Sequence, residues 1–108
     1  MRKLTMTLCL LGLGTVLSQA AGAAGDPQAG KLKAETCMGC HAVKSYNNVY
    51  PTYHVPKLGG QHADYIVSAL QGYRDGSRGH QTMHANSANL SDADMADIAA
   101  FFASSTAP

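Results

Sequence analysis

The sequence predicts a small all-α domain with three main helices and long loops between them. Apolar residues recur every three or four positions after Gln61 and again after Ser91, which is the spacing of one face of a helix. Asp26 and Pro27 are typical of a helix start, as N-cap and first-turn residue, and the stretch that follows runs toward Cys37. No segment alternates apolar and polar residues as a half-buried strand would.

Two of these helices have clear boundaries. The helix after Gln61 is expected to end at Gly76, because glycine commonly follows the last turn of a helix. Ser91 is expected to cap the last helix, and Asp94 three positions later approximates a capping box. The apolar stripes are Tyr65, Ile66, Ala69, Leu70 and Tyr73 on the former helix, and Met95, Ile98, Ala99 and Phe102 on the latter. The second stripe is expected to be buried core.

The segment between Cys40 and Gln61 has no such periodicity. Its tyrosines and valines are scattered among Asn, Pro and Gly residues. An irregular segment of roughly 20 residues is uncommon in a compact domain unless it surrounds a functional group. We therefore expect this loop to wrap around a bound group.

The composition allows one globular domain and excludes collagen-like, coiled-coil and strongly polyelectrolytic chains. The chain has 108 residues, of which 14% are charged, and a formal net charge of +1. Its eight Lys and Arg residues are nearly balanced by seven Asp and Glu residues. No basic excess is therefore available for binding nucleic acid non-specifically through its phosphates.

Residues 1–23 have the features of a secretory signal peptide. A short cationic start precedes an apolar run from Leu4 to Leu17, and Ala21–Ala23 forms a small-x-small cleavage site. The run is shorter than the roughly 20 apolar residues that a membrane-spanning helix needs, so an uncleaved anchor is the less favoured alternative. We expect cleavage to leave a periplasmic domain of residues 24–108 that does not insert into a membrane.

Residues 24–108 contain few large apolar side chains for an independent fold. They hold 20 Val, Ile, Leu, Met, Phe and Tyr residues. Domains of this size usually need disulfides, a metal or a bound group for stability. Because Cys9 lies in the signal peptide, Cys37 and Cys40 are the cysteines that remain to form a disulfide or to hold a metal or a bound group.

The run Cys37–His41 is a C-x-x-C-H sequence, the attachment signature of c-type haem. Positions i, i+3 and i+4 of a helix share one face. Cys37 and Cys40 can therefore form thioethers with one haem while His41 turns its imidazole toward the iron. A single short segment would attach the haem covalently and supply its proximal ligand.

Three alternatives compete with haem attachment. A thioredoxin-like redox pair would have a strand before the cysteines, whereas a helix-like stretch runs into them. A zinc site could recruit His80 and His84, but 39 residues separate Cys40 from His80, far more than the roughly 12–15 of zinc fingers. The third alternative is a chance match, because the motif is short.

The sixth iron ligand decides the chemistry, and Met83 is the favoured candidate. Met38 lies inside the attachment motif, too close to the proximal side to reach the far face of the iron. Met95 is accounted for by the core stripe of the last helix. Met83 instead lies in a polar, glycine-containing connection between two amphipathic helices, where a thioether would be available to the iron.

Four histidines are rivals of Met83. His80 and His84 flank it in sequence, and His54 and His62 lie further away. Ligation by any of them would lower the reduction potential, because thioether sulfur favours ferrous iron. We expect His54 and His62 to be surface or hydrogen-bonded residues and keep His80 and His84 as alternatives.

This order of features resembles a class I cytochrome c over residues 25–105, and in particular one half of the two-haem bacterial cytochromes of tandem type. A helix leads to Cys37–His41, followed by the loop segment Pro56–Gln61, a second helix, a loop with Met83 and a capped C-terminal helix. Two departures are the small Ala34, where many members have an aromatic residue, and the absence of a second C-x-x-C-H motif.

The resemblance implies contacts within the fold. Gly30 of the first helix is expected to approach Phe101 or Phe102 of the last helix closely. The carbonyl group of Pro56 is expected to accept the second ring N–H of His41, which would fix the orientation of the ligand.

The function implied is electron transfer, not enzyme catalysis, because His41 and Met83 would leave no open position on the iron. Tyr46, Arg74 and Arg78 are candidate partners of the haem propionates, with a solvated surface position as the alternative for both arginines. Redox proteins, one donor and one acceptor, are expected to dock weakly at the haem edge. Two alternative functions are a dedicated haem subunit of an oxidoreductase and a haem protein whose labile sixth ligand gives way to small molecules.

Overall fold

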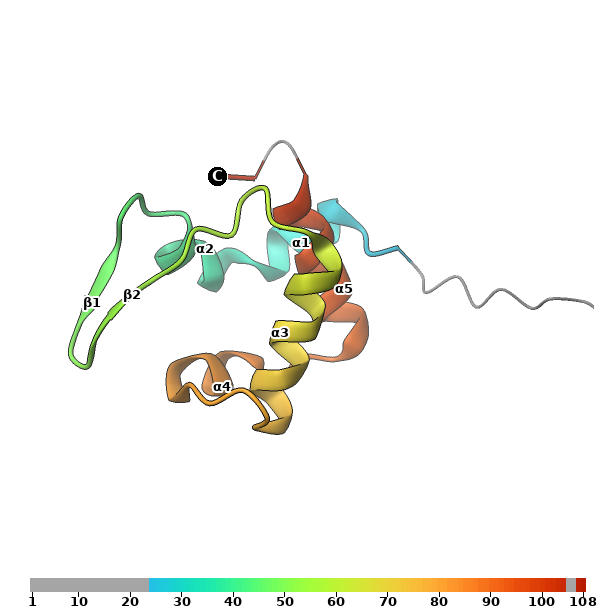
Figure 1. Cartoon of the computed structure of the whole chain (residues 1–108). Coiled ribbons are helices and arrows are strands. Elements are labelled where there is room, and N and C mark those ends of the chain that lie inside the picture. Colours follow the sequence, from blue (N-terminus) through green and yellow to red (C-terminus); the bar gives the residue numbers. More distant parts are fainter. Residues whose placement is uncertain (1–23, 105–106) are drawn as a thin grey trace, which may run out of the picture.

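The computed structural model describes residues 24–104 and 107–108, and the predicted signal peptide lies outside them. Within these ranges the chain forms five helices and one β-hairpin (Figure 1). The helical fold class predicted from the sequence is confirmed. None of the described helices has the length and apolar character needed to cross a membrane. The elements are α1 (Pro27–Lys33), α2 (Glu35–His41), β1 (Asn47–Val49), β2 (Thr52–His54), α3 (Ala63–Asp75), α4 (Gln81–Ser87) and α5 (Asp92–Ala103).

The core forms where α1 and α3 pack against α5. A Cβ atom at Gly30 of α1 would collide with the carbonyl group of Asp97 and would lie 3.0 Å from Cβ of Phe101. Only glycine therefore allows this crossing, and the expected approach of Gly30 to an aromatic residue of α5 is confirmed. The stripe of α5 is buried as predicted, and the largest fully buried core side chains are Phe102, Met95 and Ile98, each 2% exposed or less.

The first helix differs from the prediction, which had one helix running toward Cys37. The backbone of Ala34 leaves helical geometry, with φ −88° and ψ 5°, so that α1 ends there and α2 begins at Glu35. Hydrogen bonds continue across the break, from Ala34 N–H to the Gly30 carbonyl and from Met38 N–H to the Ala34 carbonyl. Alanine is the best helix former, so its identity gives no sign of the break.

The segment expected to be irregular contains the β-hairpin. β1 and β2 pair antiparallel, with Asn48 opposite Tyr53, and the Val55 N–H extends the pairing to the Tyr46 carbonyl at 2.9 Å. Each strand has three residues, and only the middle one is partly buried. Strands this short cannot show the alternation from which a strand is recognised.

The connection after α3 also has more structure than the sequence predicts. α3 ends at Gly76 as expected, and the positive φ of 84° there explains the preference for glycine. Residues 81–87, predicted to be part of a loop, form α4. Its sequence QTMHANS has no apolar stripe, which is why periodicity missed it.

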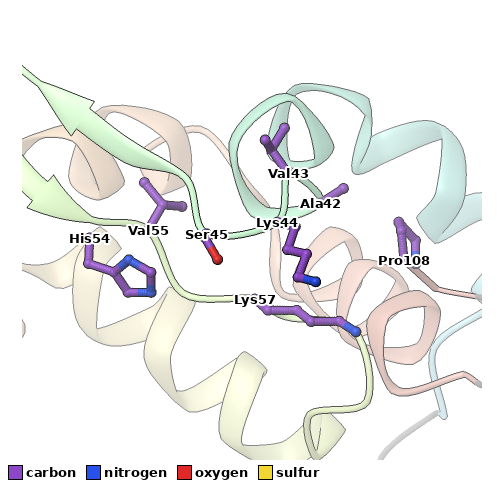
Figure 2. Close-up of a pocket in the computed structure, with 8 residues that line it drawn as sticks. All are labelled: Ala42, Val43, Lys44, Ser45, His54, Val55, Lys57 and Pro108. Carbon is purple, nitrogen blue, oxygen red and sulfur yellow. The ribbon is translucent and has the colours of Figure 1, made fainter.

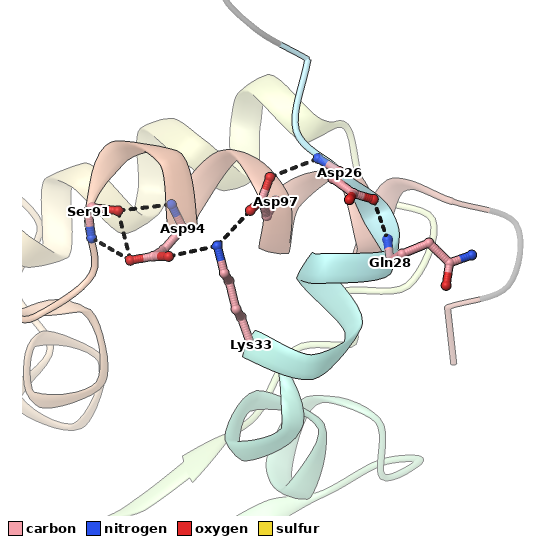
Figure 3. Close-up of polar contacts among 6 residues, drawn as sticks. All are labelled: Asp26, Gln28, Lys33, Ser91, Asp94 and Asp97. Atoms are coloured by element: carbon pink, nitrogen blue, oxygen red, sulfur yellow. Dashed lines mark hydrogen bonds and ion pairs between the residues drawn. The ribbon is translucent and has the colours of Figure 1, made fainter.

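Polar contacts tie both ends of α1 to α5 (Figure 3). The predicted capping box is present, with the Asp94 N–H donating to Ser91 Oγ and the Ser91 N–H donating to an Asp94 carboxylate oxygen. Lys33 Nζ lies 2.8 Å from the other Asp94 oxygen and 2.6 Å from Asp97 Oδ2. The Asp26 N–H donates to Asp97 Oδ1, so one cluster joins both helices.

The Lys33 cluster makes a testable contribution to stability in acid. The Lys33 ammonium holds the pKa of Asp94 and of Asp97 below their usual range. A carboxyl group with a lowered pKa stabilises the fold above its unfolded pKa, about 3.9, and this contribution is lost as the pH falls through the folded value. We expect haem-loaded K33M protein to lose less thermal stability than wild type between about pH 5 and pH 2.

The expected difference is small and weaker in high salt, because these groups are exposed to solvent. K31M is the matched control, since Lys31 lies on the same helix in no ion pair with a described residue. The prediction would be contradicted if the melting temperatures of wild type and K33M fell by the same amount as the pH is lowered.

Candidate functional site

One cavity brings the chemically active residues together. It has a volume of about 400 Å³. Residues of α2, α3 and α4 line it, together with residues of the segment that follows β1. Cys37, Cys40 and His41 line it from α2, and Met83 lines it from α4. No Asp or Glu residue is among its lining. The whole apolar stripe of α3 also lines the cavity: Tyr65, Ile66, Ala69, Leu70 and Tyr73.

Of the two cysteines, Cys37 is partly buried and Cys40 is exposed. Burial raises the pKa of the Cys37 thiol. Dithiol redox enzymes instead depress the pKa of their reactive cysteine. A helix, α1, precedes the pair instead of a strand. The geometry therefore gives no support to a thioredoxin-like site.

A zinc site also finds no support. His80 lines the same cavity as the cysteines, but His84 does not. Over residues 24–104 and 107–108, no three His, Cys, Asp or Glu side chains group closely enough to hold a metal ion.

His41 is oriented by the chain that follows the hairpin. The side chain is 8% exposed, and its Nδ1 lies 2.6 Å from the carbonyl oxygen of Pro56. Because a carbonyl oxygen only accepts hydrogen bonds, Nδ1 carries the proton and Nε2 keeps a lone pair. That is the tautomer a metal-ligating histidine needs, and the bond to Pro56 holds the ring in place.

Met83 is held by hydrogen bonds at both of its backbone polar groups. Its N–H donates to Nδ1 of His80 at 3.3 Å, and its carbonyl accepts from Oγ of Ser87 at 2.7 Å. Ser87 is fully buried. The other described methionines lie elsewhere, with Met95 in the core and Met38 packed against the core outside the cavity lining.

The rival histidines are less suited to be ligands. His80 lines the cavity, but its Nδ1 accepts the Met83 N–H, so the proton of the neutral ring is on Nε2. His84 donates from Nδ1 to the Tyr73 carbonyl at 2.7 Å and is absent from the lining. His54, exposed at the rim, contacts Asn47, and the exposed His62 lies outside the lining.

Of the three candidate propionate partners, the structure brings only Arg78 to the cavity. Its two terminal nitrogens lie 3.3 Å from the Tyr65 hydroxyl, and the guanidinium carbon lies 4.9 Å from the centre of the Tyr73 ring. Arg74 instead binds the Leu90 carbonyl and Asp92, which joins α3 to the start of α5. Tyr46 is partly buried outside the lining and pairs through its backbone with Val55.

A second cavity, about 420 Å³ in volume, lies between residues 42–45 and 54–57 (Figure 2). Lys44 and Lys57 extend along it from these two segments. It contains no cysteine, methionine or His41, so it offers none of the groups that could attach and ligate haem.

Sequence reasoning missed several residues of the first cavity. Tyr53, Thr82 and Asn86 line it, and His80 acts as the N-cap of α4. These residues belong to the hairpin and to α4 or its cap, the elements that periodicity could not detect. The signals were the flanking of Met83 by two histidines and, for Tyr53, its place in the loop expected to wrap around a bound group.

The cavity suits a haem group. Its walls combine apolar side chains such as Leu58, Ile66 and Leu70 with two thiols spaced for thioether bonds. The lone pair of His41 Nε2 and the Met83 thioether are groups of the kind that haem iron accepts as ligands.

Comparisons with known proteins support the assignment of the cavity to haem. A family model described as Cytochrome c matches residues 28–106. A cytochrome c4 of Pseudomonas aeruginosa is 43% identical over 104 residues, which cover 96% of this chain and 49% of that protein. Cytochrome c-554(548) of Halomonas halodenitrificans is 43% identical over 84 residues, 75% of this chain and 98% of that protein. A cytochrome c4 of Azotobacter vinelandii is 36% identical over 113 residues, 96% of this chain and 51% of that protein.

The chain spans about half the length of the cytochromes c4 and nearly all of cytochrome c-554(548). The resemblance to one half of a tandem cytochrome is therefore confirmed. Since the family model covers most of the chain, the chain belongs to the cytochrome c family and its domain carries one covalent haem c.

Proposed function

We propose that this chain is a periplasmic electron carrier that transfers one electron at a time through a haem ligated by His41 and Met83. The observation that carries the proposal is that His41 and Met83 line the same cavity as Cys37 and Cys40. The periplasmic location rests on the predicted signal peptide, residues 1–23.

Each residue has a defined task in this proposal. Bound haem supplies a one-electron ferric–ferrous couple. Cys37 and Cys40 hold it through thioethers, and His41, oriented by Pro56, donates its Nε2 lone pair. Met83 would supply the second protein ligand through its thioether, which would leave oxygen and peroxide no open site. The apolar wall of α3 excludes water, which limits rearrangement around the iron when its charge changes.

Redox partners are proposed to dock where the cavity opens to solvent. Cys40 is exposed and lines the cavity, so the edge of the bound group nearest to it is accessible. Outer-sphere transfer needs only approach at such an edge, and small, transient interfaces are usual for redox pairs.

A reversible redox titration of the purified haem-loaded protein tests the proposal. We expect one haem per chain and a single wave that fits a one-electron Nernst curve in both directions. A two-electron wave or an irreversible couple would contradict the proposed carrier function. Turnover of hydrogen peroxide by the wild-type protein would instead support an enzyme.

A further inference from the structure

We propose that His80 is a positioning residue that keeps Met83 bound to the iron by capping α4. The inference rests on the proposed ligation by Met83. His80 is the N-cap of α4, with extended backbone at φ −170° and ψ 107°, and its Nδ1 accepts the N–H of Met83. Met83 is therefore the third residue of the helix, the position to which an N-cap side chain usually bonds.

α4 depends on this cap more than an ordinary helix does. It has seven residues, and α3 is the only other described element with which it makes a substantial contact. Helices this short are marginal in isolation. Of its side chains, only Ser87 is buried. The partly buried Met83 side chain packs against the core, but the rest of α4 adds little buried apolar surface to hold it in place if the first turn frays.

The ring of His80 is itself held by two tyrosines. The ring centre lies 4.7 Å from that of Tyr53 at an interplanar angle of 82°, and 6.2 Å from that of Tyr73 at 72°. The Tyr53 hydroxyl also lies 3.1 Å from Oγ1 of Thr82, next to Met83. Tyr53 comes from the hairpin and Tyr73 from α3, so His80 joins both elements to the start of α4.

The backbone carbonyl side of Met83 is held by other hydrogen bonds. Ser87 donates to its carbonyl group, and His84 donates to the Tyr73 carbonyl, which ties the middle of α4 to α3. The His80 bond is thus the restraint on the Met83 N–H itself, beside the hydrogen bonds that Tyr53 and Asn86 make with Thr82. The same bond also keeps His80 from replacing Met83 as the iron ligand. While Nδ1 accepts the Met83 N–H, the other ring nitrogen, Nε2, carries the proton and has no lone pair for the iron.

The experiment measures how readily added imidazole displaces Met83 from ferric, haem-loaded protein. Binding is followed by loss of the sulfur-to-iron charge-transfer band. Removing an N-cap bond should shift the helix toward frayed states, so we expect apparent imidazole affinity to rise roughly tenfold in H80A. H80N should remain near wild type, because asparagine is a good N-cap, whereas the longer amide of H80Q should behave like H80A.

H62A is the matched control. His62 is the N-cap of α3, but its side chain makes no capping hydrogen bond and lies outside the cavity lining. We expect H62A to bind imidazole as wild type does. If H80A fails to load haem, the comparison of H80N with H80Q tests the same point.

Two results would overturn the positioning role. One is equal imidazole affinity in wild type, H62A and the H80A or H80Q variants. The other is an H80N variant as strongly affected as H80Q, which would show that the cap is not the cause. A wild-type ferric protein without the sulfur band would contradict the proposed ligation itself, so the two failures are distinguishable.

Discussion

A chain without attached haem is expected to lose most of its fold. In the double variant C37A/C40A no thioether can form, so haem cannot be retained covalently. The cause of unfolding is the way the elements connect. Among the described residues, α2 makes substantial backbone contact only with α1, α4 only with α3, and the hairpin with no other element. A bound group in the cavity is what brings these parts together.

Circular dichroism and urea unfolding of C37A/C40A measure this effect. We expect the helical signal to fall by about half or more and the cooperative unfolding transition to disappear, because the binding energy of the haem is part of the folding energy. The contacts of α1 and α3 with α5 should leave some residual helix, since the buried core residues of α5 do not line the cavity. A cooperative apo-protein with near-native helical signal would show that the cavity is preformed.

Replacing Met83 by alanine is expected to open the sixth position of the iron. The ferric protein should lose its sulfur-to-iron band, and the ferrous protein should bind carbon monoxide promptly. The reduction potential should fall by on the order of 100 mV or more, because thioether ligation favours ferrous iron. Absorption spectra and a redox titration of haem-loaded M83A measure all three changes.

M38A is the matched control for M83A. Met38 is also partly buried and packs against the core, but it is absent from the cavity lining. Its variant should keep both the band and a nearly unchanged potential. A band that survives in M83A and disappears in M38A would exchange the two assignments and contradict the proposed ligand set.

The sequence predicted the fold best where the signals are local. The caps of Asp26 and Ser91 are present, and α3 ends at Gly76. The stripe of α5 is buried core. Each of these features depends on residues within one or two helical turns, so the sequence alone determines it.

Periodicity could not show what the stripe of α3 faces. Ile66 and Leu70 are buried as core residues would be, yet they line the cavity together with Tyr65 and Tyr73. An apolar face that packs on a cofactor has the same spacing as one that packs on another helix. Only the three-dimensional arrangement separates the two.

The role of His80 lay beyond the sequence for a different reason. Histidine is not a typical N-cap, and the helix that it caps has no apolar stripe. Its partner Tyr53 lies in a hairpin with strands too short to predict. Arg74 was a candidate propionate partner, but it pairs with Asp92 instead. That pairing depends on how α3 and α5 are placed, which the sequence does not show.

We propose that His41 and Met83 both ligate the iron of one covalent haem. The absorption spectrum of the wild-type protein tests it most directly, recorded first on the oxidised form and then on the reduced form with carbon monoxide added. We expect the sulfur-to-iron charge-transfer band in the oxidised protein and no prompt change when carbon monoxide is added to the reduced protein. Absence of the band, or immediate formation of a carbon monoxide complex, would contradict the claim and favour a haem with a labile sixth position.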